Sequence, residues 1–319
     1  MHAAVVSSFD RPPRYEVVPD PVPTTDDQVV VKVLAAGLHP RVRSGANGSH
    51  YSSSGRLPLV PGIDAVGRTP QGELVYFVAS DDVAGTMAER AVADRRRSIV
   101  LSPDADPVAV AAGMNPAMSS WVALRRRVAF RPGQRVLVLG ATGNAGQMAV
   151  QIAAHLGAGR VVGAGRDAER LASLEALGAD AAVSLSGDPD RVDAELGAAC
   201  ADVDVVVDYL WGAPAEHAMR SLVRHRADRA QELAWVQVGS VAGPDVVLAS
   251  EILRAANLRV LGSGQGSVST ADIVSELPAL AAEITSGSLL VDAVPAPLSE
   301  VETAWIDGAP PGRRLVLIP

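Results

Sequence analysis

The sequence has very little of what marks secreted or membrane-spanning proteins. Only one of its 319 residues is cysteine, Cys200, so no disulfide can form within the chain. A chain without disulfides suits a reducing compartment. No run of eighteen apolar residues occurs, and the first residues lack the charged and long apolar regions of a signal peptide. We therefore expect a cytoplasmic protein without a membrane span.

Positively charged residues are also scarce, and aromatic residues make up only 3% of the chain. The 28 Lys and Arg residues are outnumbered by 36 Asp and Glu residues, and the formal net charge is −8. The arginine triplets at 95–97 and 125–127 are too short to follow a nucleic-acid backbone. This balance argues against nucleic acid and anionic membranes as partners. With 48% hydrophobic residues, the chain is nevertheless typical of a folded globular protein long enough for two domains.

The strongest positive signal is a strand, a glycine turn and a helix in succession. An apolar run over 136–139 stops at a glycine cluster, and a helical pattern follows it. Gly143 would let the backbone approach a pyrophosphate, and Gly146 would let the helix pack closely on the strand. The free N–H groups at the helix start would then face the phosphates. This context predicts a dinucleotide site formed by Thr142, Gly143, Asn144, Ala145 and Gly146.

Two features of the surrounding sequence bear on that prediction. Ala141 replaces the first glycine of the common pattern, so an ordinary crossover whose glycines serve packing alone is the alternative. The next apolar run ends in Gly165 and Arg166, where NAD enzymes usually place a carboxylate for the ribose 2′-hydroxyl. A guanidinium at this tip can pair with a 2′-phosphate, which favours NADPH as the cofactor. The adjacent Asp167 keeps NAD as the alternative.

The order of apolar runs predicts an α/β fold. The first hundred residues read as strands, at 28–37, 74–78 and 87–92, and the stretch 45–61 reads as a loop. Helices are predicted over 108–114 and 118–127, separated by Asn115-Pro116, with Asn115 as the cap of the second. The strands that follow are predicted at 135–139, 160–164, 180–184, 203–208, 233–238 and 257–262. The helices between them are predicted at 145–157, 167–177, 188–199 and 213–224.

Alternating strands and helices imply a doubly wound, Rossmann-type parallel sheet with helices on both faces. We expect it over residues 114–263, after a β-rich domain over 1–113. The segment 264–319, with a helix at 271–287 and a strand at 313–318, is too short to form a domain. It is therefore expected to return and complete the first one.

Ligands of such sheets bind beyond the carboxyl ends of the strands, which directs attention to the strand-end loops. Asp208 is expected to anchor the turn after the fourth strand. The glycine-rich loop after the sixth strand suits close approach to a nicotinamide or, alternatively, an interdomain hinge. The cofactor contacts predicted in these loops are Tyr209, Trp211, Val238, Gly239, Ser240, Gly262, Ser263 and Gly264.

Four segments together resemble the medium-chain dehydrogenase/reductase superfamily, in its quinone oxidoreductase and enoyl reductase branch. They are 31–40, 57–67, 115–121 and the glycine turn. The resemblance covers nearly the whole chain. It implies that the β-rich domain is a GroES-like catalytic domain completed by the C-terminal segment, and that the protein is a homodimer. It also places Asn115 near the cofactor and a tyrosine of the loop, here Tyr51, near the nicotinamide.

One departure from this superfamily concerns zinc. Its zinc-dependent alcohol dehydrogenases carry Gly-His-Glu where this chain reads Gly62-Ile63-Asp64, and their structural lobe needs four cysteines. We therefore expect no metal site. The chemistry that remains is hydride transfer from NADPH to a quinone, or to the C=C of an α,β-unsaturated carbonyl compound.

Two residues are candidates for the chemistry itself. The Tyr51 phenol would hydrogen-bond the substrate oxygen or donate a proton, unless it is an ordinary loop tyrosine. His39 stands where quinone reductases commonly carry asparagine. It would contact the nicotinamide ribose or donate a proton, unless it only caps the short helix that follows.

Two other functions stay open. A pathway enoyl reductase acting on a thioester would need a basic entrance, for which Arg41, Arg43 and Arg56 are the nearby candidates. A non-catalytic NADPH-binding sensor could use the same scaffold, because a fold does not guarantee chemistry. The sensor remains an alternative because His39 replaces the asparagine that quinone reductases commonly carry at this position.

Overall fold

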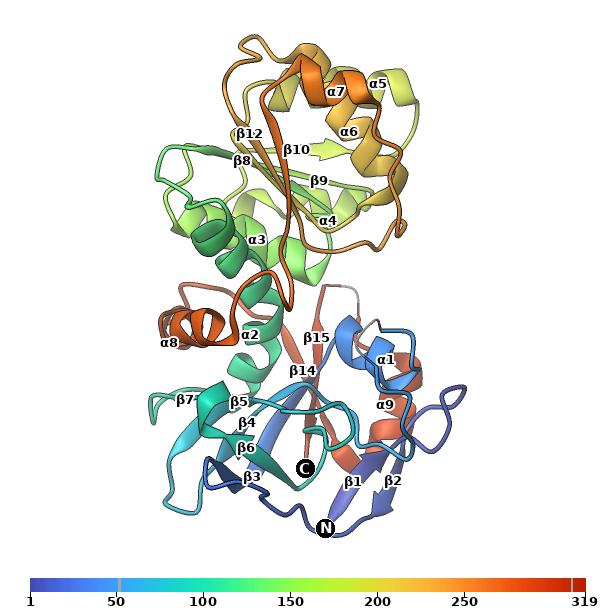
Figure 1. Ribbon diagram of the computed structural model, residues 1–319, viewed down its shortest axis with the longest axis vertical. Helices are drawn as coiled ribbons and strands as arrows, with labels where there is room; N and C mark the ends of the chain where they lie inside the picture. Colours follow the sequence, from blue (N-terminus) through green and yellow to red (C-terminus); the bar gives the residue numbers. More distant parts are fainter. Residues whose placement is uncertain (51–52, 311) are drawn as a thin grey trace. The chain divides into compact units, whose positions relative to one another are not determined.

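The computed structural model describes residues 1–50, 53–310 and 312–319, and the chain forms two compact units (Figure 1). The first unit consists of Met1–Asn115 and Thr270–Pro319, and the second of Pro116–Ser269. Both ends of the chain therefore belong to the first unit. Among the described residues, no helix is long and apolar enough to cross a membrane.

The first unit is built on a seven-stranded sheet with the order β14-β15-β3-β4-β5-β7, in which β6 also pairs with β3. Its pairs are antiparallel except β14 with β15. The C-terminal strand β15 lies against β3, so the last segment completes this sheet as predicted. The strands are β3 (Gln28–Leu38), β4 (Asp64–Arg68), β5 (Leu74–Val78), β6 (Arg90–Asp94), β7 (Ser98–Val100), β14 (Ala293–Pro297) and β15 (Arg314–Ile318).

Shorter elements surround this sheet. A separate hairpin pairs β1 (His2–Val5) with β2 (Arg14–Val17). The helices are α1 (Pro40–Ala46), α2 (Pro107–Val122), α8 (Thr270–Thr285) and α9 (Val301–Asp307), with 3-10 turns η1 (Arg95–Arg97) and η4 (Leu298–Glu300).

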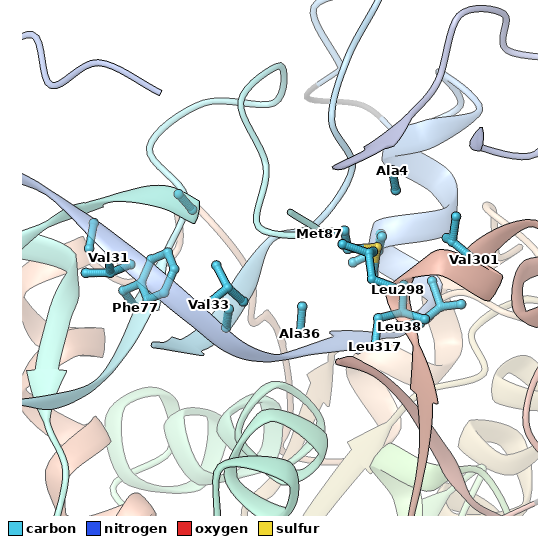
Figure 2. Packing of buried hydrophobic residues seen from close by; sticks show 14 of the residues in the cluster. Ala4, Val31, Val33, Ala36, Leu38, Phe77, Met87, Leu298, Val301 and Leu317 are labelled. Atoms are coloured by element: carbon cyan, nitrogen blue, oxygen red, sulfur yellow. The ribbon is translucent and has the colours of Figure 1, made fainter. Parts of the chain in front are cut away.

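One apolar core holds the distant parts of this unit together. Figure 2 shows Met87, Leu298 and Leu317 gathered near the end of β3, with Phe77 beside Val31 further along the same strand. These side chains come from both ends of the chain and are fully or almost fully buried. Removing such side chains from water is the main favourable term in folding. The C-terminal segment is thus part of the core.

The second unit is a six-stranded parallel sheet with the order β10-β9-β8-β11-β12-β13. The chain order reverses between β8 and β11, which is the switch point where such sheets bind ligands. The predicted Rossmann-type sheet is therefore confirmed. Its strands are β8 (Arg135–Leu139), β9 (Arg160–Gly165), β10 (Ala181–Ser184), β11 (Val205–Asp208), β12 (Leu233–Gln237) and β13 (Leu258–Gly262). Its helices are α3 (Asn144–His155), α4 (Ala168–Ala172), α5 (Pro189–Cys200), α6 (Gly212–His225) and α7 (Ser250–Ala255), with the 3-10 turn η3 (Glu175–Leu177).

The predicted break at Asn115-Pro116 is wrong. Helix α2 runs through both residues and continues into a π-helical turn, η2 (Ala123–Arg127). A proline inside a helix removes one backbone hydrogen bond and costs about 3 kcal/mol. Here the neighbours Met114 and Ala117 are completely buried, and this burial offsets the loss. Asn115 therefore lies inside a helix and caps nothing.

Two smaller expectations also needed correction. The strand predicted over 87–92 is β6, which begins three residues later, because the Met87 carbonyl accepts from the Ala4 amide and Ala88 bridges to Ala3. The predicted loop 45–61 overlaps the end of α1. At the start of β6, a contact with a distant segment overrides the local pattern.

Candidate functional site

The turn between β8 and α3 leaves no space for a side chain at Gly146. A Cβ built there would lie 2.1 Å from the carbonyl oxygen of Gly140 and 2.7 Å from the Cα of Ala141. Only glycine lets the first turn of α3 approach the end of β8 this closely. Gly143, the N-cap of α3, has no side chain with which to satisfy the helix amides. The first amides and the positive end of the helix dipole are therefore left to bind an anion.

The tip of the second strand touches this turn. A Cβ at Gly165 would lie 2.6 Å from Cγ2 and 2.8 Å from Oγ1 of Thr142. The structure thus brings Thr142 next to the end of β9, and the candidates Gly143, Asn144 and Ala145 follow it directly in the chain.

The alternative cofactor NAD depended on the carboxylate of Asp167, which follows Arg166. One oxygen of this carboxylate is already hydrogen-bonded within the protein. Asp167 is the N-cap of α4, and its Oδ1 accepts from the amide of Arg170 at 3.1 Å. The Nη2 of Arg170 in turn donates to Oδ1 of Asn144 at 3.4 Å. The exposed Arg166 is therefore accompanied by a second arginine at the rim of the glycine turn. Arg170 was not among the predicted residues, although it lies only four positions after Arg166, in the short helix α4.

The end of β11 is organised by a buried carboxylate, Asp208. Its Oδ1 accepts from the amides of Leu210 and Trp211 at 2.8 and 3.0 Å, and its Oδ2 accepts from Nε1 of Trp235 at 3.0 Å. Burial raises the pKa of Asp208, and these three hydrogen bonds oppose the shift. Trp211 has φ +52°, which is rare for a residue with a side chain. The Asp208 carboxylate holds that strained turn in place, so its expected role as an anchor is confirmed.

Tyr209 turns its phenol into the protein. Its hydroxyl lies 2.8 Å from Oγ of Ser119, and burial raises its pKa to about 12. The neighbouring backbone is packed equally closely, since a Cβ at Gly239 would lie 3.0 Å from the Tyr209 carbonyl oxygen. The phenol is therefore already committed, and Tyr209 would contact a nucleotide through its ring or main chain.

The ends of β12 and β13 lie at the same edge, because all the strands of this sheet are parallel. The amides of Val238 and Gly239 both donate to the Asp208 carbonyl, at 2.8 and 3.1 Å. The Ser263 amide donates to the Gln237 carbonyl at 2.8 Å. The candidates Ser240, Gly262 and Gly264 follow in these same loops. One carboxyl edge thus carries the strand-end candidates of the second unit.

The loop after β13 is hydrogen-bonded by an arginine that was not among the predicted site residues. Arg127 donates from Nε to the Gly262 carbonyl at 2.8 Å and from Nη1 to the Ser267 carbonyl at 3.1 Å. Its place in the π-helical turn after α2 gave no signal in the sequence.

In the first unit, His39 belongs to a buried polar chain. Its Nε2 lies 2.9 Å from Oδ1 of Asp64, whose Oδ2 accepts from the hydroxyl of Tyr76 at 2.8 Å. His39, Asp64 and Tyr76 are only 2%, 1% and 0% exposed. His39 is the N-cap residue of α1, but its ring makes no capping hydrogen bond to any described residue. His39 therefore occupies the capping position expected of a structural histidine, but it caps α1 only through its main chain, and its ring bonds to Asp64 instead.

Two further side chains adjoin this polar chain. Arg314 begins β15, where burial lowers its pKa to about 10 and the charge of Asp64 opposes the shift. The hydroxyl of Thr86 donates to the main-chain carbonyl of Asp64 at 2.9 Å. Within the described ranges, Nδ1 of His39 and Nε of Arg314 are buried without a hydrogen-bond partner. The carboxylate thus lies among a cation, a phenol and an imidazole.

The remaining candidates are less well placed. Tyr51 lies outside the described residues. Two of the three arginines considered for a thioester entrance are engaged elsewhere: Arg43 donates to the Trp305 carbonyl at 2.7 Å, and Arg56 lies 4.0 Å from Asp82.

The described side chains also do not fit a zinc site. Nowhere among them do three His, Cys, Asp or Glu residues come close enough to hold a metal ion. Cys200 is buried at the end of α5, and burial raises its thiol pKa to about 12. A metal would need it as a thiolate.

Comparisons with known proteins give matches to part of the chain and to its full length. The family model for zinc-binding dehydrogenases matches residues 145–284. The chain is 34% identical over 364 aligned positions to a probable NADPH-dependent quinone reductase of Emericella nidulans, with 100% of both proteins covered. It is 29% identical to a chloroplastic NADPH-dependent alkenal/one oxidoreductase of Arabidopsis thaliana, over 53% of this chain and 49% of that protein.

A solved structure agrees over the full length. The quinone oxidoreductase of Thermus thermophilus, determined alone and with NADPH, matches with a TM-score of 0.79 at 25% identity. The match covers 100% of both chains.

Proposed function

Because the chain belongs to the quinone and enoyl reductase branch of the medium-chain dehydrogenase/reductase superfamily, we propose that it reduces quinones or the C=C of α,β-unsaturated carbonyl compounds with NADPH and without zinc. The observation that carries this proposal is the turn between β8 and α3 that contains Gly143 and Gly146, which we call the glycine cradle. Gly146 has no room for a side chain, and Arg170 reaches the side chain of Asn144 at the start of α3.

The second unit would bind NADPH, which supplies a hydride from its nicotinamide ring. The amides of Asn144 and Ala145 would bind the pyrophosphate, while the Gly143 amide donates to the Gly140 carbonyl and closes the turn. Arg166 would pair with the 2′-phosphate, with Arg170 next to it, since guanidinium groups match phosphate oxygens in geometry and charge. The loops at 238–240 and 262–264 would hold the nicotinamide half through their main chain. The carboxylate of Asp167 supports NADPH over NADH, because it is turned into its own helix.

The first unit would supply the groups that meet the acceptor. Negative charge builds on the carbonyl oxygen of an enone as it is reduced, so a hydrogen-bond donor there lowers the barrier. We assign this part to Tyr51 and the delivery of the proton to His39. Asn115 stays a proposed cofactor contact.

A free enone or quinone is a better candidate substrate than a thioester. A thioester presented on a coenzyme A or carrier arm would need cations at the entrance. Arg43 already donates to the Trp305 carbonyl and lies over its ring at 5.1 Å, so part of its binding capacity is already used. A sensor without turnover would show the same NADPH binding but no oxidation of NADPH by any acceptor.

We further propose that the protein is a homodimer. Strand β13 is an edge of the parallel sheet, and its Val260 is 38% exposed. An exposed edge with unpaired amides and apolar side chains invites a second strand. Analytical ultracentrifugation would test this, and a monomer at micromolar concentration would contradict it.

The test of function is NADPH oxidation, followed by its near-ultraviolet absorbance, with EDTA present throughout. The acceptors are a 1,4-quinone, a simple enone, a 2-enoyl thioester and an aldehyde. We expect turnover with the quinone or the enone that survives the chelator. Turnover with the aldehyde alone, or loss of all activity in EDTA, would contradict the proposal.

A further inference from the structure

A row of three buried polar side chains runs through the first unit, from His39 through Asp64 to Tyr76. Burying polar groups costs free energy unless every one of them is hydrogen-bonded. Here a carboxylate that is 1% exposed is bonded on both oxygens, while the imidazole beside it keeps one nitrogen unbonded to any described residue. Packing alone does not call for such an arrangement.

The chemistry of the three groups determines where the protons lie. An ionised carboxylate only accepts hydrogen bonds. Burial raises the pKa of Tyr76 well above its usual value, so its hydroxyl remains a donor to Oδ2 of Asp64. The other oxygen, Oδ1, then accepts from Nε2–H of His39. A neutral His39 therefore keeps its lone pair on Nδ1, and Nδ1 is the nitrogen that can gain and release a proton.

We propose that Asp64 and Tyr76 are positioning residues that keep Nε2–H of His39 on the carboxylate, so that Nδ1, protonated in the imidazolium, delivers the proton that completes the reduction. The inference rests on the reductase function proposed above. Once a hydride has added to the β-carbon of an enone, the product is an enolate. His39 enters this step as an imidazolium, with Nδ1 already protonated from water. The N–H bond at Nδ1 breaks, its proton goes to the enolate carbon, and the electron pair stays on Nδ1, which leaves the neutral ring with its proton on Nε2. His39 then regains a proton from water.

The other groups around the carboxylate support this role. Arg314 remains a cation at neutral pH, since its lowered pKa is still about 10 and the charge of Asp64 favours its protonated form. Thr86 touches the same residue only through the main-chain carbonyl, at 2.9 Å. Thr86→Val is therefore a matched control, because it disturbs the same buried place without touching the carboxylate.

The first test measures the tautomer directly and does not depend on turnover. In ¹⁵N-labelled protein, the ring nitrogens of His39 are identified by their loss in His39→Gln. We expect a protonated Nε2 and an unprotonated Nδ1 in the neutral ring, and loss of this preference in Asp64→Asn. A neutral ring with its proton on Nδ1 would overturn the proposal, whatever the activity measurements show.

The second test separates positioning from folding. We expect Asp64→Asn to lower kcat for an enone about 100-fold or more, while KM for NADPH changes less than about twofold. Tyr76→Phe should lower kcat by about 3- to 10-fold. Thr86→Val should keep the wild-type kcat. A double variant, His39→Gln with Asp64→Asn, should be no slower than His39→Gln alone, because the residues act as a unit.

The pH profile of kcat gives a readout that damage to the fold would not produce. Removing the carboxylate charge should move its histidine-dependent limb to lower pH. Removing the phenol leaves more negative charge facing the imidazole and should move the limb to higher pH. If Asp64→Asn does not fold, Tyr76→Phe carries the same test.

Failure of this inference and failure of the proposed function look different. Wild-type protein that oxidises no NADPH with any acceptor contradicts the function. Wild-type turnover with unchanged kcat and pH profile in both positioning variants overturns the inference, as does an equal loss in Asp64→Asn and Thr86→Val.

Discussion

The two units use polar groups in opposite ways. In the second unit, the candidate site is made mainly of main-chain amides at the ends of parallel strands, and glycines make them accessible. In the first unit, it is made of buried side chains that depend on one another, with His39 bonded to Asp64 and Asp64 to Tyr76. A main-chain site is sensitive to added bulk. A side-chain site is sensitive to the loss of a single hydrogen-bonding atom.

Adding one methyl group to the cradle should have the largest effect. In Gly146→Ala, the new Cβ would lie 2.1 Å from a main-chain oxygen that cannot move aside easily. We expect the free energy of unfolding to fall by about 3 kcal/mol, at the upper end of overpacking costs, with loss of NADPH binding. Urea denaturation and fluorescence titration with NADPH measure the two effects. Gly143→Ala is the matched control for stability, because its Cβ would meet the same oxygen at 3.4 Å. Equal destabilisation by both changes would refute this account of the turn.

Removing positive charge beside the cradle should weaken NADPH binding selectively. We expect Arg166→Ala to raise the Kd for NADPH about 10- to 100-fold, the worth of a charged hydrogen bond to phosphate, with little change for NADH. Arg170→Ala should have a smaller effect in the same direction. Arg259→Ala, which removes an exposed arginine paired with Glu232 in the same unit, serves as the control. Equal weakening for NADPH and NADH would remove both arginines from the 2′-phosphate.

The buried carboxylate of Asp208, in the second unit, should also be sensitive to the loss of a single hydrogen-bonding atom. In Asp208→Asn, the side-chain N–H₂ would face at least one of the three N–H donors that the carboxylate now accepts, and that hydrogen bond would be lost. We expect the free energy of unfolding to fall by about 1–3 kcal/mol.

The pH dependence of this variant has a definite sign. Burial raises the pKa of Asp208 above its ordinary value of 3.8, so the folded protein holds this proton more tightly than the unfolded chain. Its contribution to stability is fully present below the ordinary value and is lost as the pH rises through the raised one. Urea midpoints measured across this range should fall with pH more steeply in the wild type than in Asp208→Asn. Parallel curves would show that Asp208 does not titrate in this window.

The smallest effect should come from the single thiol. Cys200 is buried and its raised pKa of about 12 leaves almost no thiolate at about pH 8. We expect no reaction of the folded protein with iodoacetamide over hours, followed by complete reaction in denaturant, measured by intact mass. Cys200→Ser should retain wild-type turnover. Rapid modification of the folded protein would show that the second unit opens near α5.

Local patterns were sufficient for much of the second unit. Its strands and the glycine turn carry periodicity and turn residues within a few positions of one another, so their prediction needs no distant contact. The Asn115-Pro116 break failed for the opposite reason. Proline has a strong local preference, but the helix around it is stabilised by burial that local rules do not contain.

The site shows the same division. The sequence by itself determined the glycine cradle, the arginine at the tip of β9 and the order of the elements, because each depends on residues that are neighbours in the chain. Only the tertiary structure decided that Arg170 reaches Asn144 across 26 positions. It also decided that His39 and Asp64, 25 positions apart, share a hydrogen bond. Such contacts follow from how strands pair and how side chains pack, and no local pattern records either.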